Sequence, residues 1–306
     1  MKKLILGFAT NQTTASVAVF LRSARAVHDA DAVDIGLVTN TTDGIADIVR
    51  ETGCRIFHTV STYGPRMGRP AKAASRAVIQ GLRALQRTGA RRRMPEIADG
   101  YRHVIEIWHH PHFARWTAIA RVLGAHAHEY EAAFLSDVKD VLFQSDVFAH
   151  LGDDAVQIFE EAHTFGEQRW NAEWVRKGYG EAAVKRLHDV RPICVGTVMG
   201  RTEPLRALCL EFFDIIGRDP FLTVEQGMFN YHYQAGTFTT PLTVIPELEG
   251  AVATLAGEVG AATTLLDGTV LRRRSDGRII PAVHGYDRYD HLRDPMAAPF
   301  LRPPAA

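Results

Sequence analysis

Apolar positions in the first sixty residues follow two alternating periods. Short continuous apolar runs predict strands over residues 4–8, 33–38 and 55–60, and helical spacing between them predicts helices over residues 15–30 and 44–51. Strands that are continuous apolar runs are typical of a parallel sheet covered on both faces. The start of the chain therefore predicts a β-α-β-α-β unit of an α/β fold.

The rest of the chain continues this alternation less regularly. Helical spacing predicts helices over residues 71–85, 112–123, 203–217 and 224–233. Apolar runs predict strands over residues 132–135, 156–159 and 192–200. The turn sequences Asp-Gly at 267–268 and Ser-Asp-Gly at 275–277 predict short strands between residues 265 and 280.

No internal repeat and no Ser/Gly-rich linker divides the sequence. We therefore predict a single domain over residues 1–306, with one half over residues 1–150 and a second half over residues 151–294. Residues 295–306 contain four prolines, and we expect them to form a loosely attached tail.

Composition narrows the possible functions. Basic and acidic residues each total 35, so the formal net charge is zero and binding to nucleic acid by bulk charge is not expected. The three cysteines, Cys54, Cys194 and Cys209, are far apart and are interpreted as reduced packing residues. No run of 18 apolar residues occurs, so we expect a cytoplasmic protein without a transmembrane segment.

The glycine-rich loop of a dinucleotide site is absent. The first predicted strand continues as FATNQTT, which does not fit G-x-G-x-x-G, and no GK[ST] sequence follows a predicted strand. NAD-dependent redox chemistry and P-loop ATP hydrolysis therefore lose their main support. Such a strand end can still hold a base and ribose through backbone groups and short side chains, here those of Phe8, Ala9, Thr10 and Asn11. Alternatively, Thr13 or Thr14 is simply a helix cap.

Two carboxylates follow the apolar strand predicted at residues 132–135. Asp137 and Asp140 place hard oxygen ligands at a carboxyl strand end, which suits Mg²⁺ or Mn²⁺ bridging phosphates. In the alternative interpretation, Asp137 caps the following turn and Asp140 pairs with Lys139 or with a nearby arginine. Asp146 is interpreted as the N-cap of a short helix.

The order of these and later segments resembles the GT-A-fold glycosyltransferases, the nucleotide-diphospho-sugar transferase superfamily. It is most similar to the glycogenin-like retaining branch and to related small bacterial and plant enzymes. These enzymes have, in order, a strand-helix-strand uridine-binding unit, an arginine-bearing helix, an acidic strand end, a small-residue strand, a helix with Asp-Gln and a late histidine. The corresponding positions here are residues 8–11, Arg115, Asp137 with Asp140, residues 195–197 (VGT), residues 225–231 (EQGMFNY) and residues 283–288 (VHGYDR).

The resemblance covers residues 4–289 and implies a fold and an activity. The implied fold is a GT-A (Rossmann-like) domain with a mixed, mainly parallel sheet and helices on both faces. Residues 1–150 would bind the nucleotide, and residues 151–294 would hold the donor sugar and the acceptor. The implied activity transfers a sugar, with retention, from a nucleotide diphosphate donor, most simply a UDP-sugar, to a hydroxyl of a glycan or small-molecule acceptor.

The resemblance also implies a metal site. Asp137, Asp140 and His284 would hold Mn²⁺ or Mg²⁺, which neutralises the departing nucleoside diphosphate. Arg115 and Arg288 would contact the donor phosphates, because guanidinium groups match phosphate oxygens. Without the resemblance, His284 is a half-buried structural histidine and Arg115 a surface salt-bridge residue.

Glu225 and Gln226 would face the donor sugar. Glu225 would accept hydrogen bonds from sugar hydroxyls and Gln226 would lie near the anomeric carbon, although Glu225 can equally be a helix-dipole partner. The chain departs from the family pattern at three points. It has D-x-x-D instead of D-x-D, glutamate where aspartate is common at position 225, and no asparagine before Gly196. We therefore expect some donor-sugar contacts to differ.

Three further groups of residues are candidates for binding. Trp170 and Trp174 are candidates for an acceptor surface, although tryptophans four residues apart also form core contacts. Six of the 14 histidines lie between residues 103 and 128, but no cysteine or carboxylate completes a zinc set, so we expect loop and cap roles. Arg66 and Arg69 lie in a predicted loop that can close over a diphosphate or remain solvated.

Two other functions are compatible with the sequence. A metal-dependent nucleotidyl- or phosphotransferase can use the same acidic strand end. A noncatalytic protein that binds a sugar nucleotide or a glycan can use the same fold without turnover.

Overall fold

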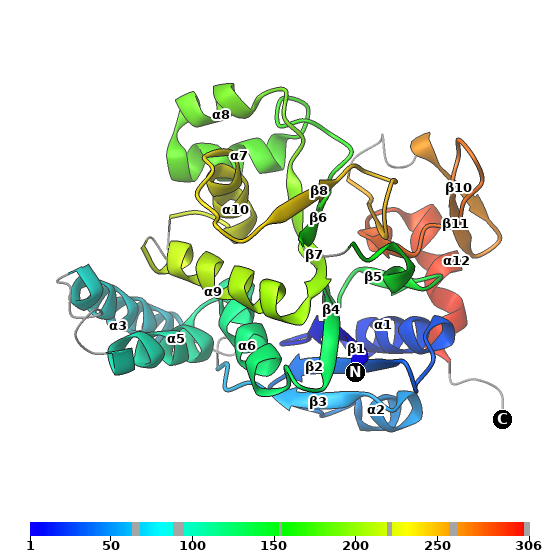
Figure 1. Cartoon of the computed structure of the whole chain (residues 1–306), viewed down its shortest axis with the longest axis horizontal. Helices are drawn as coiled ribbons and strands as arrows, with labels where there is room; N and C mark the ends of the chain where they lie inside the picture. The colour runs from blue at the N-terminus through cyan, green and yellow to red at the C-terminus, as the bar shows by residue number, and fades with distance from the viewer. Residues whose placement is uncertain (63–67, 88–94, 153–154, 219–221, 257–261, 303–306) are drawn as a thin grey trace.

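A seven-stranded sheet forms the centre of the computed structural model, which describes residues 1–62, 68–87, 95–152, 155–218, 222–256 and 262–302 (Figure 1). The strand order is β3-β2-β1-β4-β7-β6-β8. The strands are β1 (Lys2–Phe8), β2 (Val33–Thr39), β3 (Arg55–His58), β4 (Tyr130–Asp137), β6 (Val156–Glu160), β7 (Ile193–Arg201) and β8 (Leu242–Ile245). Neighbouring strands are parallel except that β7 is antiparallel to β4 and β6. The predicted α/β class with a mixed, mainly parallel sheet is confirmed.

Helices cover both faces of the sheet, as the continuous apolar strands predict. Leu4 and Leu6 of β1 point into one core, whereas Ile5 points into the core on the opposite face. The second core is covered by α1 (Thr14–Val27) and α2 (Ala46–Thr52). The first is covered by α6 (Pro111–Ala125), α9 (Thr202–Arg218) and α10 (Glu225–Gln234).

Two helix caps lie where the sequence predicts them. The Thr13 side chain accepts a hydrogen bond from the backbone N–H of Ser16 (3.2 Å) and begins α1. Asp146 accepts from the N–H of Phe148 (2.9 Å) and begins the 3₁₀ helix η1 (Val147–His150). The capping interpretation of Thr13 and Asp146 is therefore confirmed.

Besides the C-terminal helix described below, three helices of the described residues are absent from the prediction: α5 (Pro95–Trp108), α7 (Arg169–Tyr179) and α8 (Glu181–Leu187). The helix predicted at 71–85 is longer, α3 (Arg69–Arg87), and packs against α5 to form an arm that projects beside α6 and α9 (Figure 1). Tyr101 and Ile105 of α5 are buried with Phe213 of α9. These tertiary contacts stabilise α5 even though Gly100 lowers its helix propensity.

A second, three-stranded sheet joins distant segments. It consists of β5 (Val141–Phe143), β9 (Val252–Thr254) and β12 (Ala282–His284). The last of these is antiparallel to β5, with His284 opposite Val141, and parallel to β9. The hairpin of β10 (Thr264–Asp267) and β11 (Val270–Arg273) confirms the turn predicted at 267–268.

The prediction of a loosely attached tail is wrong for residues 295–301. These residues belong to α12 (Asp290–Leu301), which follows the 3₁₀ helix η2 (Tyr286–Arg288) and packs on α1. Leu292 and Met296 are buried, and the Arg22 side chain donates a hydrogen bond to the backbone oxygen of Phe300 (2.9 Å). Burial of these apolar side chains offsets the helix hydrogen bonds that the two prolines remove. Residues 303–306 lie outside the described residues.

Among the described residues, no helix combines the length and the apolar character needed to cross a bilayer. The three cysteines are buried and form no disulfide.

Met296→Ala tests whether α12 is part of the core. Because Met296 is fully buried, we expect the free energy of unfolding to fall by about 2–5 kcal/mol in urea denaturation. Asp294→Ala, on the exposed side of the same helix, is the control and should change it by no more than about 0.5 kcal/mol. Equal, small effects of both substitutions would instead indicate a loosely attached segment.

Candidate functional site

The site begins where β1 and β4 end side by side. The two strands are parallel, and Phe8 is paired with Asp137 at their carboxyl ends, the edge at which open α/β sheets bind ligands. A short turn then leads from β4 to β5, whose partner β12 carries His284. The backbone N–H of Gly285 donates to the carbonyl oxygen of Asp140 (2.7 Å) and holds this junction together.

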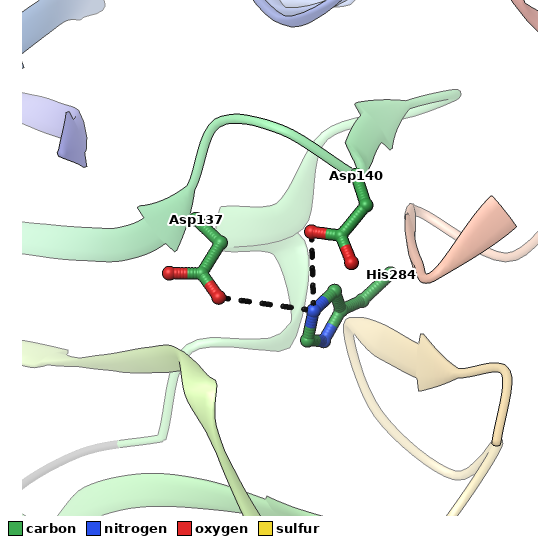
Figure 2. A group of neighbouring side chains, drawn as sticks. All are labelled: Asp137, Asp140 and His284. Carbon is green, nitrogen blue, oxygen red and sulfur yellow. Dashed lines mark ion pairs between the residues drawn. The ribbon is translucent and has the colours of Figure 1, made fainter. Parts of the chain in front are cut away.

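Asp137, Asp140 and His284 converge in space (Figure 2). The His284 Nε2 atom lies 3.5 Å from Asp140 Oδ1 and 4.0 Å from Asp137 Oδ2. One donor atom from each of the three residues lies within 4.8 Å of the others. Two carboxylates and one imidazole that face a common point form a donor set that fits a divalent ion such as Mn²⁺.

Gly196 of β7 makes this convergence possible. A Cβ atom at position 196 would lie 2.6 Å from His284 Cε1 and 2.7 Å from Asp137 Oδ2. Any larger residue would therefore displace one of the two side chains. The small-residue strand that the sequence places at 195–197 runs directly against the cluster.

The acidic residues are paired with cations. Asp137 accepts from Arg115, and Asp140 lies 3.4 Å from Arg288, whereas Lys139 pairs with Asp287 (3.2 Å) and not with Asp140. Burial alone would raise the pKa of Asp140, but the charges of His284 and Arg288 lower it below its usual value. Asp140 is therefore ionised at neutral pH.

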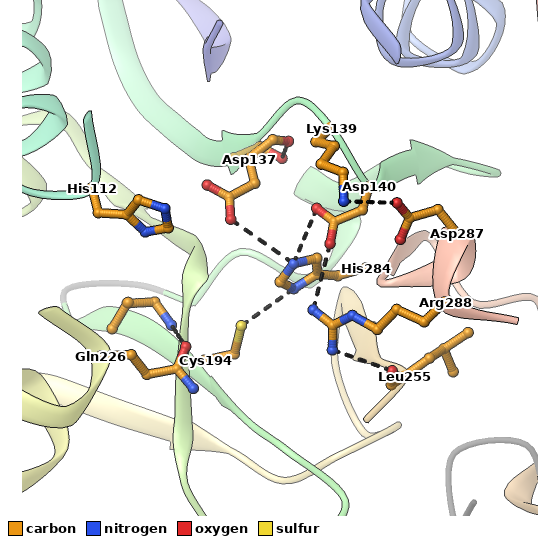
Figure 3. A network of polar contacts seen from close by, with 12 residues as sticks. His112, Asp137, Lys139, Asp140, Cys194, Gln226, Leu255, His284, Asp287 and Arg288 are labelled. Carbon is orange, nitrogen blue, oxygen red and sulfur yellow. Dashed lines mark hydrogen bonds and ion pairs between the residues drawn. The ribbon is translucent and has the colours of Figure 1, made fainter. Parts of the chain in front are cut away.

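Cys194 belongs to the site and is not only a packing residue. Its Sγ atom lies 3.2 Å from His284 Nδ1, the ring nitrogen that faces away from the carboxylates (Figure 3). A polar partner on this nitrogen fixes the orientation of the imidazole. Burial opposes the charged imidazole, but the neighbouring Cys194 and Asp140 raise the pKa of His284 well above its ordinary value.

Arg115 is buried and bound to acceptors of the protein itself. Besides Asp137, its guanidinium donates to the backbone oxygen of Val195 (2.9 Å) and to Glu225 Oε1 (3.3 Å). It thus links the end of β4 to the start of α10, and it is not the surface salt-bridge residue of the alternative interpretation. Its contact with donor phosphates stays a prediction.

His112 is a site residue that the sequence analysis assigned to a loop or cap. Its Nδ1 atom lies 2.8 Å from Glu225 Oε1, at the first turn of α10. Burial would raise the pKa of Glu225, but His112 and Arg115 lower it to about 2. The charge of Glu225 in turn raises the pKa of His112. The histidine cluster was the only sequence signal for this role.

Gln226 joins a buried polar group that the sequence analysis missed. Its side-chain amide donates to Glu161 (2.8 Å) and to Asn171 (2.7 Å), and the Asn171 amide donates to Glu161 (2.8 Å). Burial raises the pKa of Glu161 above its ordinary value. No sequence motif marked Glu161, which directly follows β6.

A cleft of about 1260 Å³ contains most of these groups. Its lining includes Phe8, His112, Arg115, Asp137, Asp140, Glu161, Asn171, Cys194, Glu225, Gln226, His284 and Arg288. The other predicted nucleotide-binding residues are not among the residues that line it: Ala9 and Thr10 are buried, and Asn11 has a left-handed backbone (φ 61°).

Trp170 and Trp174 also line the cleft. They lie on α7, a helix that the apolar pattern of the sequence did not predict. Arg69 is exposed at the start of α3, and Arg66 lies outside the described residues.

Comparisons with known proteins do not add to this picture. The sequence matches no protein-family model and no curated protein at a significant level. The geometry of the cleft is therefore the main indication of function.

His112→Gln tests the pairing with Glu225. The raised pKa of His112 means that its charge contributes stability below about pH 6.5, and that this contribution is lost as pH rises through the raised value. We expect the difference in free energy of unfolding between the native chain and the variant to be larger near pH 6 than near pH 9, measured by urea denaturation. A difference that does not change with pH would contradict the ion pair.

Proposed function

We propose that this protein is a metal-dependent glycosyltransferase of the GT-A type. It would transfer a sugar from a nucleotide diphosphate donor, a UDP-sugar, to a hydroxyl group of an acceptor. The observation that supports this most directly is the convergence of Asp137, Asp140 and His284 in a large cleft at the carboxyl ends of β1 and β4. The resemblance to the GT-A-fold glycosyltransferases implies the same set of metal ligands. These residues come from segments far apart in the sequence, the end of β4 with its following turn and β12.

The position and size of the cleft support a two-substrate reaction. Its volume of about 1260 Å³ exceeds the roughly 300–1,000 Å³ of a typical single-ligand pocket. Phe8, at the end of β1, lines the part next to Asp137, where residues 8–11 would hold the base and ribose. The diphosphate would then lie beside the acidic cluster.

Asp137, Asp140 and His284 would hold Mn²⁺ or Mg²⁺. When bound, the cation supplies positive charge that stabilises the departing nucleoside diphosphate. Arg288 lines the cleft next to Asp140 and would add a guanidinium directed at the phosphates. In the transfer, the anomeric carbon forms a bond to the acceptor oxygen and loses its bond to the diphosphate oxygen. If the configuration is retained, as the resemblance implies, the departing diphosphate would take the proton of the acceptor hydroxyl.

Glu225 is well suited to bind the donor sugar. Its Oε1 atom is bound by His112 and Arg115, whereas among the described residues its buried Oε2 atom has no hydrogen-bond partner. The residue lines the cleft, so Glu225 would accept a hydrogen bond from a sugar hydroxyl once its side chain turns Oε2 toward the cleft. This bond would also relieve the cost of a buried acceptor without a partner. Its pKa of about 2 keeps Glu225 ionised, so it acts as an acceptor and not as an acid.

Thermal unfolding with UDP and Mn²⁺ tests the donor class and the cofactor together. We expect the two ligands combined to raise Tm more than either alone, since a ligand at about 100 times its Kd adds about 2.7 kcal/mol. Asp140→Asn should lose the Mn²⁺-dependent part of the shift and the release of UDP from UDP-sugars. Asp287→Asn, a nearby carboxylate that pairs only with Lys139 among the ion pairs of the site, is the control and should keep both.

Each other outcome of this experiment identifies a different function. Release of pyrophosphate would indicate a nucleotidyltransferase. Binding of a UDP-sugar without any release of UDP would indicate a noncatalytic binding protein. The absence of a Tm shift with every nucleotide diphosphate would refute the proposal.

Gly196→Ala tests the geometry of the cluster without changing a ligand. The added methyl group would contact His284 and Asp137, so we expect Mn²⁺ affinity to fall by at least about tenfold in a calorimetric titration. Gly81→Ala, where the added atom meets nothing within 4 Å, should bind Mn²⁺ as the native chain does. Equal affinity of both variants would remove the cluster as the metal site.

A further inference from the structure

We propose that the wall of the cleft formed by α7 is the acceptor subsite, and that it binds a carbohydrate ring stacked on Trp170. This inference rests on the proposed function and names the class of acceptor for it. The proposed subsite gives a role to α7, which the proposed donor and metal binding do not use.

Trp170 is unusual in its exposure. Its relative accessibility is 65%, whereas Trp116 is buried in the core at 2%. Trp170 lines the same cleft as Asp137, together with Trp174 and Trp108, so three of the four tryptophans face this space. A large exposed aromatic side chain inside a cleft indicates a binding surface, because its apolar face gains most from being covered. The alternative of a core contact does not account for Trp170.

The backbone under Trp170 is firmly held. The Gln168 side chain caps α7 by accepting from the N–H groups of Trp170 (3.1 Å) and Asn171 (3.2 Å). One turn further on, the Thr223 hydroxyl donates to the carbonyl oxygen of Trp174 (2.6 Å). A Cβ atom at Gly227 of α10 would lie 2.8 Å from Trp174 Cβ, so the two helices are in close contact. The indole is therefore presented from a rigid position, as a binding site requires.

The same helix connects the indole with the proposed donor-sugar site. Asn171, the residue after Trp170, is hydrogen-bonded to Gln226 and Glu161. A ring stacked on Trp170 would therefore lie on the wall that also carries the polar group around Gln226. Gln168 and Lys177, which line the cleft, can bind hydroxyl groups at the edge of such a ring.

The position of α7 favours a sugar over a nucleotide base. The base would lie at the end of β1, whereas α7 packs against α10 and α8 and lies well away from β1 (Figure 1). Pyranose rings expose a face of C–H groups that matches an indole face, while their hydroxyls bind polar groups around it. The guanidinium carbon of Arg169 lies 6.0 Å from the centroid of the Trp170 ring. The indole nevertheless remains mostly exposed.

Fluorescence titration of the full chain tests the subsite. Maltose, lactose and cellobiose are added separately to protein saturated with UDP and Mn²⁺, and tryptophan emission is recorded. We expect at least one disaccharide to change the emission saturably, and Trp170→Ala to weaken its binding by about 3- to 10-fold, measured by calorimetry. Trp170→Tyr, which keeps an aromatic face, should stay within about 2-fold. Val78→Ala, an exposed apolar residue outside the cleft lining, is the control and should bind as the native chain does.

The outcomes separate this proposal from the proposed function. If no disaccharide binds, or if Trp170→Ala binds as tightly as the native chain, the acceptor subsite is wrong. The same conclusion follows if Trp170→Ala lowers the Tm shift caused by UDP with Mn²⁺, because the indole would then stack on the nucleotide. If disaccharides bind through Trp170 while UDP and Mn²⁺ cause no shift, the subsite stands and the glycosyltransferase proposal fails.

Discussion

The pairing of β12 with β5 is the constraint on which the candidate site depends. The acidic turn is held on one side by β4, in the central sheet, and on the other by β5, in the small sheet. Because β12 is antiparallel to β5, His284 lies directly beside the turn, and the bond from Gly285 to Asp140 closes the junction. Without this register the imidazole and the two carboxylates would not face one another, and the cleft would lack the candidate metal site.

Charge pairing is the second organising principle. Burying ionised groups is costly unless each one has a partner. Here charged groups of alternating sign line the cleft: Arg288 pairs with Asp140, His284 links Asp140 to Asp137, Arg115 bridges Asp137 and Glu225, and His112 completes the row. The row keeps Asp140 and Glu225 ionised in spite of their burial, as the lowered pKa values of both carboxyls indicate. It also ties β4, α6 and α10 together, so the proposed metal and sugar contacts share one framework.

The second half of the chain gives the cleft its other wall. The α7 and α10 helices are joined by the hydrogen bonds of Gln226 with Asn171 and by the close contact at Gly227. The exposed indole of Trp170 and the acidic cluster therefore line the same cleft of about 1260 Å³. The arm of α3 and α5 borders the same space, since Arg76 and Trp108 are among its lining residues.

Local pattern in the sequence determined the α/β class, the first three strands, the caps at Thr13 and Asp146, and the position of both aspartates at the carboxyl end of a buried strand. These features depend on neighbours within a few residues, so periodicity and turn chemistry reveal them. The resemblance implied that His284 joins the two aspartates, although no local pattern indicates it. Only the tertiary structure showed that His284 lies beside Asp140, that Cys194 contacts the imidazole, that Arg115 is buried between two carboxylates, and that residues 290–301 form a packed helix. Each of these depends on the register of strands or on the packing of helices far apart in the chain. A single sequence does not encode such contacts in any local pattern.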